Sequence, residues 1–220
     1  PPPLARPPPA MTGLPNTPPQ ARAIGKAELA DRMFYEFEEA VRNAAVAAEL
    51  LYADADAYPP RDVPLPRMEN DGKLAVQVLF ATGVDPQDEA IQREVRLLGN
   101  FQEALYAINS NNPSIVSNYI ATESGIMFQA DYISARKFDE AGNIMPLDAK
   151  ERPWYQGAAE TGELFLTEVV EDLHTKRPTV MCGVPIYSDG VLKGVAGAGM
   201  DLDKGEALVE ERDVGESVQA

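Results

Sequence analysis

The chain has 220 residues, of which 45% are hydrophobic and 25% are charged, so it can bury a sizeable core. Its 35 acidic and 19 basic residues give a formal net charge of -16. Because a strongly acidic protein repels polyanions, we expect no nucleic-acid partner. The single cysteine, Cys182, excludes an internal disulfide framework, and the single histidine, His174, excludes most zinc sites and the usual pairs of nucleophile and base.

The beginning of the chain is rich in proline, with nine of the 19 prolines in the first twenty residues. Proline fixes φ and lacks an N–H group, so residues 1–22 are expected to form an extended or disordered arm outside the fold. No signal-peptide pattern and no apolar run long enough to cross a bilayer occurs, and the chain begins at Pro1. We therefore expect it to be a piece of a longer protein.

Residues 23–58 show apolar side chains at helical spacing with charged residues between them, which predicts one long amphipathic helix. The apolar stripe consists of Leu29, Met33, Phe37, Val41, Ala44, Ala48 and Leu51. Such a stripe is more often the core face of a helix than a dimer seam, although a homodimer through this helix stays an alternative.

Four prolines between residues 59 and 66 then predict an extended connector, with which the folded module of residues 59–203 begins. The apolar run Leu74–Phe80 is short enough for a strand, although its periodicity does not exclude a helix. Asp85 and Pro86 are typical of a helix N-cap and first turn, and they predict a second helix that ends near Asn111.

The second half of the chain is dominated by strands. Ile115–Ala121 and Ile126–Ala130, separated by a turn, predict a hairpin, and Asp148–Gly162 predicts a short helix. Three further strands are expected at Phe165–Val170, Thr179–Tyr187 and Val191–Met200. Because strands joined by tight turns pair antiparallel, the fold class is α+β, with helices packed on one antiparallel sheet.

The residues most informative about function are Arg152, Trp154 and Tyr155, which lie together at the start of the predicted short helix. Arginine offers a planar fork that suits a carboxylate, and the two rings supply apolar walls with polar tips. The same residues are equally consistent with a structural role, in which the rings anchor the core and Arg152 pairs with a neighbouring acid. The P-loop, nucleophile-elbow and zinc-helix motifs are absent, so we expect no metal, no cofactor and no enzyme activity.

Several motifs in order resemble a Cache sensor domain. They are Arg152-Pro153-Trp154-Tyr155, Thr167-Glu168, Asp172, the strand ending Val184-Pro185-Ile186-Tyr187 and the glycine-rich strand Leu192–Gly197. The hairpin around Tyr119-Ile120-Ala121 matches the segment that precedes this block in the family. The resemblance covers about residues 29–202.

The resemblance implies a PAS-like antiparallel sheet with a long N-terminal helix and helices packed on the sheet. It implies the membrane-distal module of a double Cache domain, in a bacterial transmembrane signalling receptor such as a chemoreceptor, kinase, cyclase or phosphatase. Such a domain is extracytoplasmic and is attached to the cell membrane through segments outside this chain. Residues 204–220 would then be a linker or the start of a second module.

In family members that bind amino acids, the positions matching Arg152 and Trp154 take the ligand carboxylate. Those matching Tyr155 and Asp172 take its amine. The resemblance thus implies a small-molecule ligand held by these four residues, with further wall residues expected at Tyr119, Met127, Gln129 and Tyr132.

Three positions depart from the family pattern: Leu147 replaces an aromatic residue, Val170 a tyrosine and Gly199 an aspartate. Asp201 could replace the lost acid, since residues two apart in a strand share a face, but only if the last strand is shifted. With one acid in place of two, a charged amine is less well stabilised, so an amino acid, another carboxylate and a more apolar neutral metabolite are all open as ligands.

Three functional hypotheses follow. The leading one is a ligand-binding sensor module that relays binding through its long helix. A structural or dimerisation spacer with a degenerate pocket is the second. A carboxylate-based hydrolase is the third, and it would need Asp148 or Glu168 beside Asp172 in one open groove.

Overall fold

A computed structural model describes residues 18–172 and 176–207. Most of the predicted arm and residues 208–220 of the predicted second module lie outside the described residues, as does His174. Among the residues that are described, no helix is both long enough and apolar enough to cross a membrane.

The long N-terminal helix α1 spans Pro18–Ala53, so its predicted range, residues 23–58, was wrong at both ends. The helix includes residues 18–22, which had been assigned to the arm, because prolines are tolerated in the first turn, where no intrahelical N–H bond is lost. After Ala53 the chain forms a single 3-10 turn at Ala55–Ala57 before the prolines of the connector. The predicted apolar stripe is confirmed as a core face along most of its length, since Phe37, Val41, Ala44, Ala48 and Leu51 are buried.

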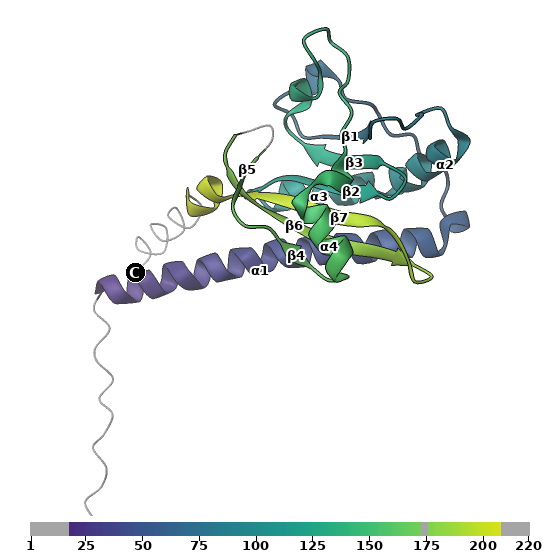
Figure 1. Ribbon diagram of the computed structural model, residues 1–220. Helices are drawn as coiled ribbons and strands as arrows, with labels where there is room; N and C mark the ends of the chain where they lie inside the picture. The colour runs from purple at the N-terminus through teal and green to yellow at the C-terminus, as the bar shows by residue number, and fades with distance from the viewer. Residues whose placement is uncertain (1–17, 173–175, 208–220) are drawn as a thin grey trace, which may run out of the picture.

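In the described part of the chain, seven strands form one antiparallel sheet (Figure 1). They are β1 (Ala75–Phe80), β2 (Ile115–Thr122), β3 (Ile126–Asp131), β4 (Phe165–Leu166), β5 (Val170–Glu171), β6 (Pro178–Ser188) and β7 (Val191–Asp201). The strand order is β1-β3-β2-β7-β6-β4, and β5 pairs with the other end of β6. The predicted fold class, α+β with a PAS-like antiparallel sheet behind a long helix, is confirmed.

The β6–β7 hairpin closes through Asp189 and Gly190, which both have positive φ, 51° and 74°. Two such residues form the turn type whose twist matches that of the flanking strands, and asparagine or aspartate followed by glycine is its usual sequence. The predicted hairpins are therefore confirmed at both β2–β3 and β6–β7. The apolar run Leu74–Phe80 forms a strand, β1, from Ala75 onward, and this strand lies at the edge of the sheet against β3.

The two faces of the sheet have different roles, because side chains alternate along each strand. Ile120 and Phe128 belong to the main core, beneath α1, α2 (Glu89–Leu98) and α3 (Gln102–Asn111). Their neighbours Tyr119 and Met127 face the other side, where α4 (Pro153–Thr161) packs. Figure 1 shows α1 running along one side of the sheet, with α4 lying over β6 and β7.

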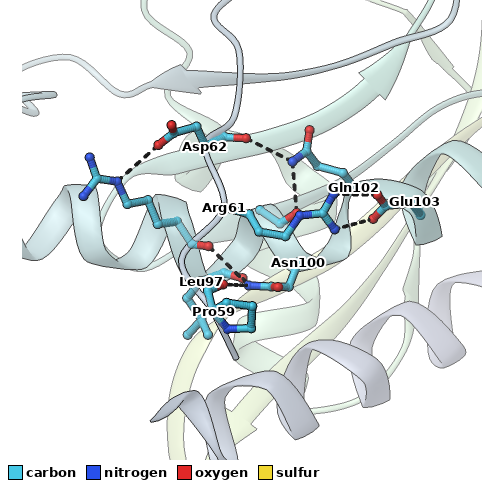
Figure 2. Close-up of polar contacts among 9 residues, drawn as sticks. Pro59, Arg61, Asp62, Leu97, Asn100, Gln102 and Glu103 are labelled. Atoms are coloured by element: carbon cyan, nitrogen blue, oxygen red, sulfur yellow. Dashed lines mark hydrogen bonds and ion pairs between the residues drawn. The ribbon is translucent and has the colours of Figure 1, made fainter. Parts of the chain in front are cut away.

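The predicted second helix is wrong as a single element, because it divides into α2 and α3 at a 3-10 turn, Gly99–Phe101. The connector crosses the chain at this point: a Cβ atom on Gly99 would lie 2.1 Å from the carbonyl oxygen of Arg61. The Arg61 guanidinium donates two hydrogen bonds to the Glu103 carboxylate, at 2.7 and 2.8 Å, and Asn100 Nδ2 donates to the carbonyl of Pro59 (Figure 2). Tertiary packing of the connector, and not local propensity, breaks the helix.

Two further predictions need correction. The predicted helix Asp148–Gly162 consists of a 3-10 turn, Ala149–Glu151, followed by α4. Its C-terminal end is as expected, because Gly162 follows α4 in the left-handed conformation. The predicted strand Phe165–Val170 is interrupted between the two short strands β4 and β5. Thr167 still contacts β6, because its N–H donates to the carbonyl of Met181 at 2.9 Å and its Oγ1 accepts from the N–H of Met181.

The N-cap of α2 is Asp88, not the predicted Asp85. The Asp88 carboxylate accepts hydrogen bonds from the backbone N–H groups of Ala90 and Ile91, at 2.8 and 3.2 Å. Asp85 accepts only from the N–H of Gln87, in an exposed turn before the helix. We expect Asp88→Ala to lower the free energy of unfolding by about 1 kcal/mol. The matched variant Asp85→Ala should stay within about 0.5 kcal/mol of the wild type in urea denaturation, and equal losses would contradict the assignment.

Candidate functional site

A cavity of about 560 Å³ lies between the α4 side of the sheet and the segments that cover it. Its floor is formed by side chains of β2, β3, β6 and β7, and its cover by the start of α4, the segment around β5 and the residues after β3. Volumes of a few hundred cubic ångström are typical of sites for small molecules.

Seven of the eight predicted site residues line this cavity. They are Arg152, Trp154, Asp172, Tyr119, Met127, Gln129 and Tyr132. Tyr155 does not line it, and its predicted role is corrected here: its buried hydroxyl donates a hydrogen bond to Glu123 Oε1, at 2.5 Å. Consecutive helical residues point about 100° apart, and here only the first of the two, Trp154, lines the cavity.

Arg152 is the N-cap residue of α4 and has an extended backbone, with φ -86° and ψ 141°. The proline that follows it favours this conformation, and Arg152 lines both this cavity and a smaller one that also contacts Leu147. The side chain is half-buried and has no hydrogen bond or ion pair with any residue that the structure describes. Asp148, an acid close to it in sequence, instead accepts two hydrogen bonds from Thr82, at 2.7 and 2.9 Å, and these lower the pKa of its carboxyl. The guanidinium is therefore available to a ligand.

Two glycines bring the aromatic walls close to the sheet. A Cβ atom on Gly183 would lie 2.4 Å from the carbonyl oxygen of Trp154, and one on Gly197 would lie 2.2 Å from the Tyr119 ring. The indole and the Tyr119 ring pack with their centroids 4.6 Å apart. The glycine-rich strand thus serves close packing, as its position in a strand indicates. Trp154 is both a core anchor and a wall of the cavity.

Asp201 lines the cavity, where the sequence predicted an acid from this position only if the last strand were shifted. It lies on the same face of β7 as Gly199, and it is buried. One of its oxygens accepts a hydrogen bond from Arg177 Nη1, at 3.1 Å, and the other accepts from the N–H of Lys204. Its charge is therefore already balanced by Arg177.

A buried ion pair that the sequence did not reveal lies beside the cavity. Lys137 Nζ donates to both oxygens of Asp131, at 2.6 and 2.7 Å, and both side chains are almost completely buried. Burial lowers the pKa of the Lys137 ammonium, and Asp131 opposes that shift. Gln77 and Gln129 also donate side-chain N–H groups to Asp131. A carboxylate only accepts hydrogen bonds, so the amide oxygen of Gln129 faces away from Asp131.

The positions that depart from the family pattern give the cavity an apolar character. Leu147 and Val170 both line it, together with Met127 and Met181. Within the described residues, Asp148 and Glu168 do not line it, so neither of the two acids that the hydrolase hypothesis required joins Asp172 in this cavity.

The described part of the chain has no group of three histidine, cysteine, aspartate or glutamate side chains that could hold a metal ion. Cys182 is buried on the α1 face of the sheet, where burial raises the pKa of its thiol to about 12. It is therefore a core residue and not a thiolate nucleophile at neutral pH.

No protein-family model and no curated protein matches this sequence. Some solved structures resemble it. The ligand-binding domain of the Pseudomonas aeruginosa PAO1 amino-acid chemoreceptor PctC, in complex with GABA, is 23% identical with a TM-score of 0.38, over 59% of this chain and 54% of that chain. The sensory domain of the Campylobacter jejuni chemoreceptor Tlp3, with isoleucine bound, is 16% identical with a TM-score of 0.44, over 87% of this chain and 63% of that chain.

The ligand-binding domain of the Pseudomonas aeruginosa PAO1 amino-acid chemoreceptor PctB, in complex with L-Arg, is 20% identical with a TM-score of 0.36, over 49% of this chain and 44% of that chain. This chain thus spans less than two thirds of each of these three solved chains. None of the TM-scores reaches one half, so the function of this chain rests on its own residues.

Removing one member of the buried Lys137–Asp131 pair should destabilise the fold strongly. We expect Lys137→Met to lower the free energy of unfolding by about 3–5 kcal/mol, because Asp131 would be left as an uncompensated buried charge. Asp131→Asn added to that variant should recover part of the loss. The control Lys150→Met removes an ion pair to Glu123 whose side chains are 48% and 39% exposed, and it should cost at most about 1 kcal/mol. Equal losses in the two single variants would contradict the role assigned to burial.

The Glu123 carboxylate should make the free energy of unfolding depend on pH. Partial burial alone would raise its pKa, but Lys150 and Tyr155 lower it below its ordinary value. The contribution of Glu123 to the free energy of unfolding is therefore complete above the pKa that its carboxyl has in the unfolded chain. It is lost as the pH falls through the lower pKa of the folded state. The difference in free energy of unfolding between the wild type and Glu123→Gln should be constant above about pH 5 and shrink below about pH 4. If the difference between the two proteins grows as the pH falls, the pKa of Glu123 is not lowered in the folded state.

Proposed function

We propose that the chain is a ligand-binding sensor domain that recognises a small molecule through its carboxylate. The observation that carries the proposal is the half-buried guanidinium of Arg152, which faces the cavity and is paired with no described residue. Its planar fork fits the two oxygens of a carboxylate, and the indole of Trp154 forms the adjoining wall. The Cache resemblance of the motif supports the same role.

The charges around the cavity favour an anionic ligand. Five basic residues line it, namely Arg136, Arg152, Lys176, Arg177 and Lys204, against four acidic residues, namely Asp131, Glu171, Asp172 and Asp201. Three of those acids are paired with a basic residue: Asp131 with Lys137, Glu171 with Lys176 and Asp201 with Arg177. The lining is thus slightly basic in a chain with a net charge of -16. Such a local reversal attracts anions to the cavity.

The apolar walls indicate the rest of the ligand. Leu147, Val170, Met127 and Met181 suit an aliphatic body, which would fill space where the family pattern has polar aromatic groups. An ammonium group on the ligand would depend on Asp172, because Asp201 already pairs with Arg177. Aliphatic carboxylic acids are therefore the favoured class, and amino acids with an aliphatic side chain are the second.

Binding would act on the rest of the receptor through α1. A series of hydrogen bonds connects the two: Tyr155 donates to Glu123 in the β2–β3 turn, Ser124 in the same turn donates to Glu94 on α2, and Tyr52 on α1 donates to the other oxygen of Glu94. Tyr155 follows Trp154 directly, so a ligand that moves the start of α4 changes this series. A ligand shifts the equilibrium only by its difference in affinity for the two arrangements.

The membrane context belongs to the same proposal and rests on the resemblance. The domain would lie outside the cytoplasm, joined to the membrane by segments beyond this chain. A homodimer through α1 would use its exposed apolar side chains Tyr35, Val46 and Leu50, because the main stripe is buried in the core. The spacer alternative needs a cavity filled by the domain's own side chains, which the open volume beside Arg152 does not favour.

A ligand screen tests the function directly. In thermal unfolding with millimolar amino acids, aliphatic acids, amines and purines, we expect carboxylates to raise the melting temperature.

Arg152→Ala should weaken binding of such an acid by about 10–100-fold in calorimetry, because a charge-assisted bidentate pair is lost, while the fold stays nearly as stable. The control Arg67→Ala, an exposed arginine on the connector, should bind as the wild type does. No shift with any compound would support the spacer, and equal affinity after Arg152→Ala would refute the carboxylate clamp.

A further inference from the structure

The hydroxyl of Tyr119 is a buried polar group without a hydrogen-bond partner among the described residues. The residue is only 3% exposed. Two other tyrosines, Tyr52 and Tyr155, both have their hydroxyl groups satisfied, by Glu94 and Glu123. A buried hydroxyl without a partner costs about 1–3 kcal/mol, so such a group in a folded domain calls for an explanation.

Tyr119 cannot easily turn to find a partner elsewhere. Its ring lies over Gly197, its cross-strand neighbour on β7, in the space that a Cβ atom would occupy. The indole of Trp154 packs against it from α4. The ring is therefore held between strand and helix, and its side chain lines the cavity. No described protein group satisfies the polar tip of a side chain that lines the cavity.

The surroundings of this hydroxyl determine what it can do. Burial raises the pKa of Tyr119 well above its ordinary value, Cys182 and then Asp172 raise it further, and Arg152 lowers it. The phenol therefore stays protonated at neutral pH and lies within the electrostatic reach of Asp172 and Arg152. Arginine can only donate hydrogen bonds, so a ligand atom between Arg152 and a Tyr119 O–H must be an acceptor.

We propose that the Tyr119 hydroxyl donates a hydrogen bond to the same ligand carboxylate that Arg152 binds, which makes Tyr119 a specificity-determining residue of the site. The inference rests on the proposed function and deepens it. The Arg152 guanidinium only donates, and the Tyr119 hydroxyl can donate beside it, so the pair favours a carboxylate over a carboxamide, whose N–H₂ group Arg152 cannot accept. The hydroxyl remains unsatisfied in the empty domain, so its partner is gained only on binding.

The decisive variant is Tyr119→Phe, tested with 4-methylpentanoate, an aliphatic acid that suits both Arg152 and the apolar walls. Calorimetry should show its affinity reduced by about five- to twentyfold relative to the wild type. The melting temperature of the empty variant should equal or exceed that of the wild type, because an unsatisfied buried group is removed. A tyrosine that serves structure alone would give the opposite pair of results.

Tyr106→Phe is the control, since it removes the hydroxyl of an exposed tyrosine on α3 that does not line the cavity. It should leave both the melting temperature and the affinity for 4-methylpentanoate unchanged. The wild type should also bind this acid more tightly than 4-methylpentanamide, and Tyr119→Phe should reduce that preference.

The outcomes separate the inference from the function on which it rests. If Arg152→Ala loses affinity and Tyr119→Phe does not, the inference fails and the proposed function stands. If both variants bind 4-methylpentanoate as the wild type does, or the wild type binds neither probe at millimolar concentration, both fail for this class of ligand. A Tyr119→Phe protein that is less stable or does not fold would also overturn the inference, because its hydroxyl would then have a structural partner.

Discussion

The cavity depends on how closely the start of α4 approaches the sheet. Gly183 on β6 leaves room for the carbonyl of Trp154, and Gly197 on β7 leaves room for the ring of Tyr119. A side chain at either glycine would push the helix or the ring outward, at a cost typical of an overpacked core. Because the indole and the phenol ring are fixed in this way, Arg152, two residues before the indole, is held at the rim of the cavity. Backbone proximity thus provides the rigidity that a binding site needs.

Several acids around the cavity are neutralised by basic partners, whereas the guanidinium of Arg152 is paired with no described residue. Buried carboxylates are tolerated only with partners, and Asp131 and Asp201 have theirs in Lys137 and Arg177. The Asp131 pair also fixes the amide of Gln129, so it orders one wall of the cavity while its own charge is cancelled. The lining therefore presents few unbalanced charges, which makes the unpaired guanidinium of Arg152 more effective toward an anion. A low-dielectric wall strengthens that attraction.

Local sequence patterns predicted much of the fold, because turn chemistry and side-chain alternation are local properties. They located both hairpins and the buried stripe of α1. They failed where distant parts of the chain decide the outcome. The break at Gly99 is caused by the connector, whose Arg61 carbonyl occupies the space of a side chain, and Lys137 meets Asp131 only after the chain turns back on itself. Seven of the eight predicted site residues line the cavity, whereas Tyr155 does not, because its hydroxyl is directed to Glu123 in the β2–β3 turn.

The cavity and α1 lie on opposite faces of the sheet, which limits how a molecule in the cavity would act on the helix. The packed strands β6 and β7 separate the cavity from α1, and their close pairing resists small displacements. The hydrogen bonds through Glu123 and Glu94 pass around the end of the strands, at the β2–β3 turn, where both carboxylates accept from hydroxyl groups. Directional bonds between few groups break or form in discrete steps, unlike a continuous apolar core. In the proposed sensor, a displacement of the start of α4 would therefore reach Tyr52 through these hydrogen bonds more readily than through the sheet itself.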